Sequence, residues 1–212
     1  MRELSITRAL SELKLLDQKI EKQLDDASFV ETRKAKVDKV KNGLMTVKEF
    51  EEKAKATYQS VKDLIEQRKR IKSAIVKSNA ETIVEVAGVK YTVADAIERK
   101  NSIQYEKDLL STLKSNLAQA THKIESANMR LEKDIQRMVE GFVGKDTQNN
   151  KDVVDTAQKM ADSKRENEQL VFVDPLNSKV LIETMETEII EFENEVDMCL
   201  SEINAQTTIE VE

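Results

Sequence analysis

The sequence predicts a mainly α fold: long antiparallel, coiled-coil-like helices that form an elongated helical bundle with one short β-hairpin. The 212 residues include only four glycines and one proline, so few positions interrupt a helix. Apolar residues also recur at spacings of three and four over long stretches, which is typical of helices with one buried face. We therefore expect residues 1–212 to form a single elongated helical domain.

Two helices are expected in the first 80 residues. The first spans 4–27, where the apolar residues at helical spacing are Ile6, Leu10, Leu13, Leu16, Ile20 and Leu24. The second begins at Thr46, because Thr46 and Glu49 have the spacing of a capping box. Its seam has one charged member, Arg68, and comprises Val47, Phe50, Ala54, Thr57, Val61, Leu64, Arg68, Ile71 and Ile75.

The longest helix is expected over residues 93–139, after a second cap-like start formed by Thr92 and Asp95. Its seam residues follow one another at seven-residue intervals: Ile103, Leu110, Leu117, Ile124, Leu131 and Met138. A helix of this length spans about 70 Å at ~1.5 Å per residue. It must therefore pack along equally long partners. Gly141–Gly144 is expected to end it.

The last helix is expected to open at Asp174 and Pro175, with Asp174 as the N-cap and Pro175 in the first turn. Its seam runs from Ile182 to Ile203, and the tail after it is expected to extend as a strand. The change to a two-residue period around Ala87 and Gly88 predicts a β-hairpin over 82–91.

Three segments do not fit this regular pattern. Residues 28–45 form an excursion that is either a hairpin or irregular, and the pattern does not decide between these. Residues 141–169 form an insertion with a short amphipathic helix around 152–163. Residues 170–173 are either a short strand or an extended link.

Several kinds of chemistry are excluded by composition and spacing. One cysteine and one histidine rule out a multi-cysteine zinc or iron–sulfur site and a multi-histidine metal centre, so we expect no cofactor. The run from Gly141 to Lys145 lacks the spacing of a P-loop, and 146–152 lacks the glycine and glutamate of a calcium loop. His122 and Cys199 belong to no recognisable catalytic arrangement. We assign no catalytic residue and expect a protein that is not an enzyme.

Hydropathy and charge bear on location and partners. No stretch approaches the ~20 apolar residues of a membrane span, so we expect a cytoplasmic protein without a membrane partner. All 34 basic residues lie within residues 1–179, and ten acidic residues follow Lys179. Residues 67–80 carry five basic residues and no acid. The charged side chains of these segments are either solvated, or paired across helices or subunits, or directed at an anion. The acidic balance and the lack of interleaved aromatic residues disfavour duplex nucleic acid.

The junction at the predicted hairpin is a candidate anion site. The hairpin brings the basic end of one helix close to the Thr92 start of the next, where free N–H groups and the helix dipole suit phosphate or carboxylate. The candidate ligand-binding residues are Arg68, Arg70, Lys77, Asn79, Tyr91, Thr92 and Arg99, with Tyr91 as a stacking face. The alternative is a capped turn with solvated charges, and for Arg68 an ion pair that sets helix register.

Four blocks carry a resemblance to a known group. They are SNAETIVEVAGVKYTVADAIERKNSI, SITRALSELKLLDQKI, FVDPLN and EVDMCLSEINAQTTIEVE. Together they resemble a group of helical proteins of bacteria and their phages, some of which are labelled septicolysin, and the longer form of this chain looks phage-like. The resemblance implies a helical hairpin protein that forms a homo-oligomer. The segments 28–45 and 141–169 depart from the shorter bacterial members.

Three functions are therefore hypotheses from the sequence. The first is a non-enzymatic, homo-oligomeric protein that sequesters a small anionic, nucleotide-like ligand, acting as an anti-defence protein in the host cytoplasm if it is phage-encoded. The second is a structural scaffold that acts by self-association. The third is an inhibitor that binds a host protein through its acidic last helix.

Overall fold

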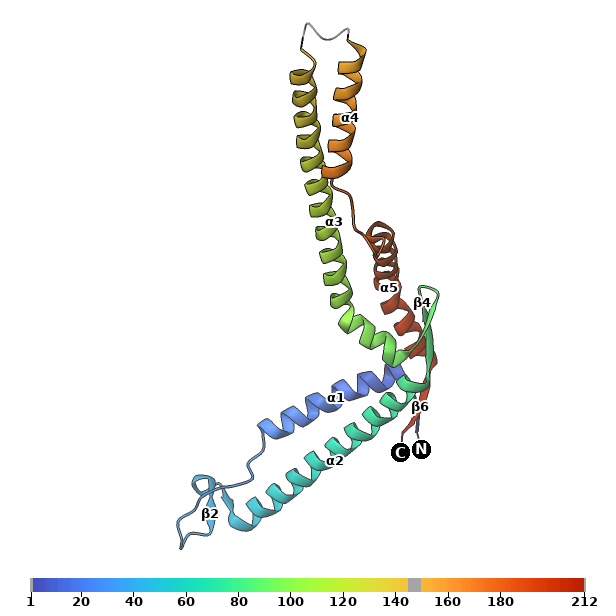
Figure 1. The fold of residues 1–212 in the computed structure, drawn as a ribbon. Coiled ribbons are helices and arrows are strands. Elements are labelled where there is room, and N and C mark those ends of the chain that lie inside the picture. Colours follow the sequence, from blue (N-terminus) through green and yellow to red (C-terminus); the bar gives the residue numbers. More distant parts are fainter. Residues whose placement is uncertain (1, 145–149, 212) are drawn as a thin grey trace. The chain divides into compact units, whose positions relative to one another are not determined.

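The computed structural model describes residues 2–144 and 150–211 (Figure 1). It confirms the mainly α fold, with five helices and short antiparallel strand pairs among these residues. The chain divides into two compact units. Unit 1 comprises Met1–Asn101 and Glu191–Glu212, and unit 2 comprises Ser102–Ile190.

Helices α1 (Ile6–Asp25) and α2 (Val47–Glu81) lie side by side and share one apolar cluster of unit 1 (Figure 1). Both helix starts are capped. The Arg8 N–H donates to Ser5 Oγ, and Thr46 and Glu49 form the predicted capping box. The two helices share a cluster of Leu4, Ile6, Ala9, Leu13, Leu16, Ile71, Ile75 and Ile209. The predicted spacing is confirmed for most of these helix positions, but the predicted seam residues Leu10 and Leu24 are 43% and 48% exposed.

Two short strands join the ends of the chain to this core. Strands β1 (Arg2–Ser5) and β6 (Thr208–Val211) pair antiparallel, with Leu4 opposite Ile209. Both of these side chains are buried in the α1–α2 cluster. The expected tail strand is therefore present, and it has a partner more than 200 residues away in the sequence.

The predicted hairpin is present as β4 (Ile83–Val86) and β5 (Val89–Thr92). Its turn residues Ala87 and Gly88 have φ values of +51° and +73°, the left-handed conformation that a two-residue hairpin turn requires. The Ala87 N–H donates to Glu195 at 2.8 Å, which holds the turn against the last helix.

The excursion at 28–45 contains both alternatives considered from the sequence. Its second half holds the two-residue strands β2 (Lys39–Val40) and β3 (Met45–Thr46) around the 3₁₀ turn Lys41–Gly43. Its first half has no regular secondary structure. The Phe29 ring contacts the Tyr58 ring edge-on at 6.4 Å between centroids, which attaches this half to α2.

In unit 2, a helical hairpin is formed by α3 (Val93–Phe142), from residue 102 onward, and α4 (Lys151–Glu168). The α3 helix ends where the Gly141–Gly144 run predicts, and α4 is longer than the helix expected at 152–163. Residues 145–149 of the insertion, including most of the rejected calcium-loop run, lie outside the described residues. The hairpin contact buries Leu131, Ile135 and Ala161.

The start of α5 (Ser178–Gln206) corrects one expectation. The prediction that Asp174 and Pro175 open the helix is wrong by a few residues, because Asn177 has a φ of +51° that no helix can contain. Asp174 instead closes a turn before the helix, since its carboxylate accepts from the N–H groups of Leu176 and Ser178.

The link before α5 is extended and forms no strand. The Asn128 side-chain amide donates to the Leu170 carbonyl at 3.0 Å and accepts from the Leu170 N–H at 2.9 Å. This pair of hydrogen bonds fixes the end of the link on α3. Within the described part of the chain, no helix is both long enough and apolar enough to cross a membrane.

Candidate functional site

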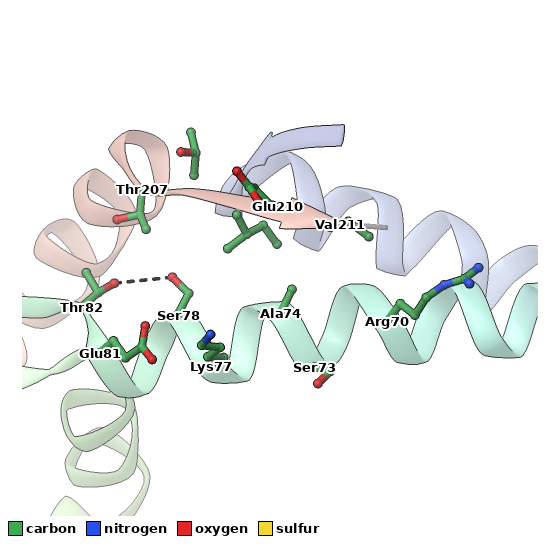
Figure 2. Close-up of a pocket in the computed structure, with 12 residues that line it drawn as sticks. Arg70, Ser73, Ala74, Lys77, Ser78, Glu81, Thr82, Thr207, Glu210 and Val211 are labelled. Carbon is green, nitrogen blue, oxygen red and sulfur yellow. Dashed lines mark hydrogen bonds between the residues drawn. The ribbon is translucent and has the colours of Figure 1, made fainter. Parts of the chain in front are cut away.

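A groove of about 760 Å³ runs between the C-terminal half of α2 and strand β6 in unit 1 (Figure 2). Two of the candidate anion ligands, Arg70 and Lys77, line it. The full lining comprises Arg70, Ser73, Ala74, Lys77, Ser78, Glu81, Thr82, Thr207, Thr208, Ile209, Glu210 and Val211. The groove therefore joins one face of a helix to a strand from the far end of the chain.

Each wall of the groove follows from local structure. Arg70, Lys77 and Glu81 are seven and four residues apart, so they share one face of α2. On the other wall, all five residues 207–211 contribute, although alternate side chains of a strand point to opposite faces. The groove therefore runs along the edge of β6. Within the described residues, β1 is the strand paired with β6, so the ladder extends on one side of β6.

The groove is mixed in charge. Arg70 and Lys77 supply two cations and form no ion pair with any carboxylate of the described residues. Glu81 and Glu210 supply two anions, and serine and threonine hydroxyls lie between them. The hydroxyl oxygens of Ser78 and Thr82 lie 3.4 Å apart, and a dashed line marks this hydrogen bond in Figure 2. The arrangement suits a ligand that carries both an anionic group and hydrogen-bond donors.

Arg68 lies outside this groove. Its guanidinium donates to the carboxylate of Asp17 and forms an ion pair between α2 and α1. The hydrogen bond and charge of Asp17 raise the pKa of Arg68. This contact corresponds to the structural alternative raised from the sequence, in which Arg68 relates the two helices.

Tyr91 and Arg99 form a second cluster, at the start of α3. The Arg99 guanidinium lies 4.5 Å from the Phe192 ring centroid and 5.8 Å from that of Tyr91, and it donates to the Tyr91 hydroxyl. The Tyr91 and Phe192 rings meet edge-on. These side chains tie β5 and α3 to α5, and neither Tyr91 nor Arg99 lines the groove.

Thr92 is a helix cap, as the sequence predicts. Its hydroxyl donates to the Asp95 carboxylate at 2.7 Å and accepts from the Asp95 N–H at 3.0 Å. The Val93 N–H donates to the Thr82 carbonyl at 2.9 Å. Two N–H groups proposed for an anion are therefore used within the chain. Asn79 is half-buried beside Ser78 and does not line the groove.

The sequence reasoning missed the β6 wall. Thr207, Thr208 and Glu210 lie about 130 residues from Lys77 in the sequence. The alternating pattern of a strand does not indicate which element the strand packs against. The signal that was available is the alternation in the tail, which predicts the strand but not where it packs.

Two further polar groups were tested as sites. His122 is exposed on α3, and within the described ranges no three histidine, cysteine or acidic side chains lie close enough to hold a metal ion. Cys199 is half-buried on α5, and burial raises the pKa of its thiol, with a smaller contribution from Glu195 and Glu202.

Comparisons of the chain with models of protein families, with characterised proteins and with solved structures found no significant match.

Proposed function

We propose that this protein is a non-enzymatic, self-associating helical protein that sequesters a small nucleotide-like ligand in the α2–β6 groove. The single observation that carries the proposal is the groove itself, because it gathers unpaired Arg70 and Lys77 with several hydroxyls. In this proposal, the phosphate group contacts Arg70 and Lys77. Charge-assisted hydrogen bonds from guanidinium and ammonium groups are the usual means of holding phosphate.

The two carboxylates of the groove narrow the ligand class. Glu81 and Glu210 repel a compact polyanion, but they accept hydrogen bonds from sugar hydroxyls or amino groups. A nucleotide carries an anionic group and such donors on one molecule, whereas inorganic phosphate carries only the anion. Following the resemblance to septicolysin-labelled and phage proteins, we propose a nucleotide signal of host defence as the ligand, bound in the host cytoplasm.

Self-association is the second part of the proposal. The strict seven-residue seam of α3 leaves Leu110, Leu117 and Ile124 only half-buried within the chain. Exposed apolar seams of this kind are typical of helices that pack against another copy. Sedimentation should therefore give a mass well above that of the 24.2 kDa chain at micromolar concentration.

Calorimetry with a panel of nucleotides tests the ligand. Replacing Arg70 or Lys77 with alanine should weaken binding about ten- to a hundredfold, since each charge-assisted hydrogen bond contributes ~1.5–3 kcal/mol. Lys48→Ala is the matched control, because Lys48 is an exposed cation of the same helix that does not line the groove. Its binding should equal that of the wild type.

Arg99→Ala separates the groove from the hairpin junction. If the ligand lies in the groove, this variant should bind normally although its aromatic contacts with Tyr91 and Phe192 are lost. Weaker binding by Arg99→Ala together with normal binding by Arg70→Ala would move the site to the junction. No binding of any nucleotide by the wild type would refute the sequestration proposal.

A scaffold function is the second candidate. It is favoured by the many large apolar side chains that the chain leaves exposed, among them Val171, Val173 and Leu176 in the link before α5, which are 71%, 92% and 61% exposed. A scaffold would self-associate without any ligand and would show no thermal shift with nucleotides. Capture of a bacterial host protein through α5 would instead support the inhibitor hypothesis.

A further inference from the structure

Helix α2 carries a second stripe, on a different flank from Arg70 and Lys77 of the α2–β6 groove. The stripe follows a four-three-four-three-four spacing and comprises Tyr58, Lys62, Ile65, Lys69, Lys72 and Val76. All six side chains are exposed, and the apolar members Tyr58, Ile65 and Val76 are 60%, 44% and 56% exposed. This is the spacing of a coiled-coil seam, with lysines between apolar positions.

The surface of the stripe also contains a depression. A shallow, mostly apolar groove of about 490 Å³ is lined by Ile65, Arg68, Lys69, Lys72, Ser73 and Val76. Lys62, Lys69 and Lys72 form no ion pair with the carboxylates of the described residues. The surface therefore presents an apolar floor between unpaired cations, and it fits an apolar side chain flanked by acids.

The same unit carries a surface with that chemistry. On α5, residues Glu191, Glu195, Met198 and Glu202 are exposed and follow a four-three-four spacing. Tyr58, Lys62, Ile65 and Lys69 on α2 have the same spacing. With Met198 opposite Ile65, Glu195 matches Lys62 and Glu202 matches Lys69, whereas Glu191 falls opposite Tyr58. Met198 is 57% exposed, and Glu191 and Glu202 pair with no lysine or arginine of the described chain.

We infer that the lysine stripe of α2 docks on the acidic stripe of α5 in a second copy of this chain. Ile65 and Met198 form the apolar contact, and the lysines face the glutamates across it. The inference rests on the proposed self-association and adds a second interface to the one proposed at the α3 seam. Complementary charges flanking an apolar seam determine which helices pair, and they make the contact sensitive to salt.

Charge exchange tests this interface in the full chain. Lys62→Glu/Lys69→Glu should weaken self-association about tenfold or more, because two attractive pairs become repulsive. Glu195→Lys/Glu202→Lys should do the same, because these two acids face Lys62 and Lys69; Glu195→Lys also removes the contact with the Ala87 turn. Mixing the two variants should restore the wild-type mass in sedimentation, since the reversed charges match again.

Lys151→Glu/Lys159→Glu is the control, because these exposed lysines of α4 change the net charge equally and lie outside the stripe. It should associate like the wild type. Circular dichroism checks that each variant keeps its helices. A wild-type oligomer that both stripe variants keep, with or without mixing, would overturn this interface and leave the proposed self-association standing.

Two other outcomes also decide the matter. A wild-type monomer would refute the self-association proposal itself, and the interface with it. Lys62→Glu/Lys69→Glu could instead keep the wild-type mass and lose co-sedimentation with phosphatidylglycerol vesicles. This result would assign the stripe to an anionic lipid surface and overturn the docking of a second copy.

Discussion

The two units hold their helices together in different ways. In unit 1, eight buried apolar residues from two helices and two strands form one continuous cluster. In unit 2, the cluster between α3 and α4 comprises Leu131, Ile135 and Ala161, with Met138 and Val139 partly buried against it. Exposed ion pairs supplement it, since Arg165 donates to both oxygens of Glu132, at 2.7 and 2.9 Å.

This difference bears on how the stability of each helix pair should respond to salt and pH. Burial of apolar surface is the main favourable contribution to folding, whereas exposed ion pairs contribute little and are screened by salt. The α1–α2 pair of unit 1 shares the larger cluster. The α3–α4 pair of unit 2 shares a smaller one, so its stability should depend more on salt and on pH.

The largest expected effect is in the α3 seam. Leu117→Lys should abolish the assembly, because it places a charge on the seam that we propose a second copy covers. Burial of an unpaired charge costs several kcal/mol, and the lost packing of a buried leucine adds ~2–5 kcal/mol. Sedimentation measures the outcome. Retention of the wild-type mass would mean that the α3 seam around Leu117 faces solvent.

The next effect is in the core of unit 1. Ile71 is only 1% exposed, so Ile71→Ala should lower the free energy of unfolding by ~2–5 kcal/mol. Leu15→Ala on the neighbouring helix α1 is the control, because Leu15 is 54% exposed and loses fewer contacts. Urea unfolding of the two variants gives the comparison, and equal losses would contradict the burial described here.

A smaller effect is expected when acid weakens the contact between α3 and α4 in unit 2. The hydrogen bond from Arg165, with its charge, holds the pKa of Glu132 below the ordinary value of 4.5. The contribution of this pair to stability is therefore present above the unfolded-state pKa, and it is lost as the pH falls through the lower folded-state pKa.

Hydrogen exchange of the α4 amides between pH 6 and pH 3, corrected for the intrinsic pH dependence of exchange, measures this loss. Protection in the wild type should fall as Glu132 is protonated. Glu132→Gln should start with lower protection and show a weaker pH dependence. An identical pH dependence in the two proteins would show that the ion pair does not stabilise the hairpin.

The smallest expected effect is on the rate at which the Cys199 thiol of unit 1 reacts. Because burial raises the pKa of its thiol, the native protein should react slowly with a thiol reagent at pH 8 and fast after denaturation. The native rate should keep rising with pH beyond the range of an ordinary cysteine. Equal native and denatured rates would show that the thiol is exposed, and Cys199→Ala should leave the assembly intact.

Part of the candidate site was predictable. The run of bases in α2 indicated Arg70 and Lys77, because a helical pattern shows which residues share a face. Their position opposite Thr207 and Glu210 was not predictable, because it depends on the pairing of β1 with β6. The grouping of Arg68, Tyr91 and Arg99 with them also required contacts that only the folded chain determines, and those contacts separate the three from the groove.

The sequence by itself determined the elements whose cause is local. The caps at Thr46 and Thr92, the turn at Ala87 and Gly88, and the seam of α2 all depend on residues within a few positions of one another. Only the tertiary structure decided the rest: that Arg68 meets Asp17, that Arg99 lies over Phe192, and that the last strand forms a groove wall. The physical reason is that these contacts join residues about 50 to 130 positions apart, and their partners are selected by the packing of whole helices and strands, which a periodic pattern does not encode.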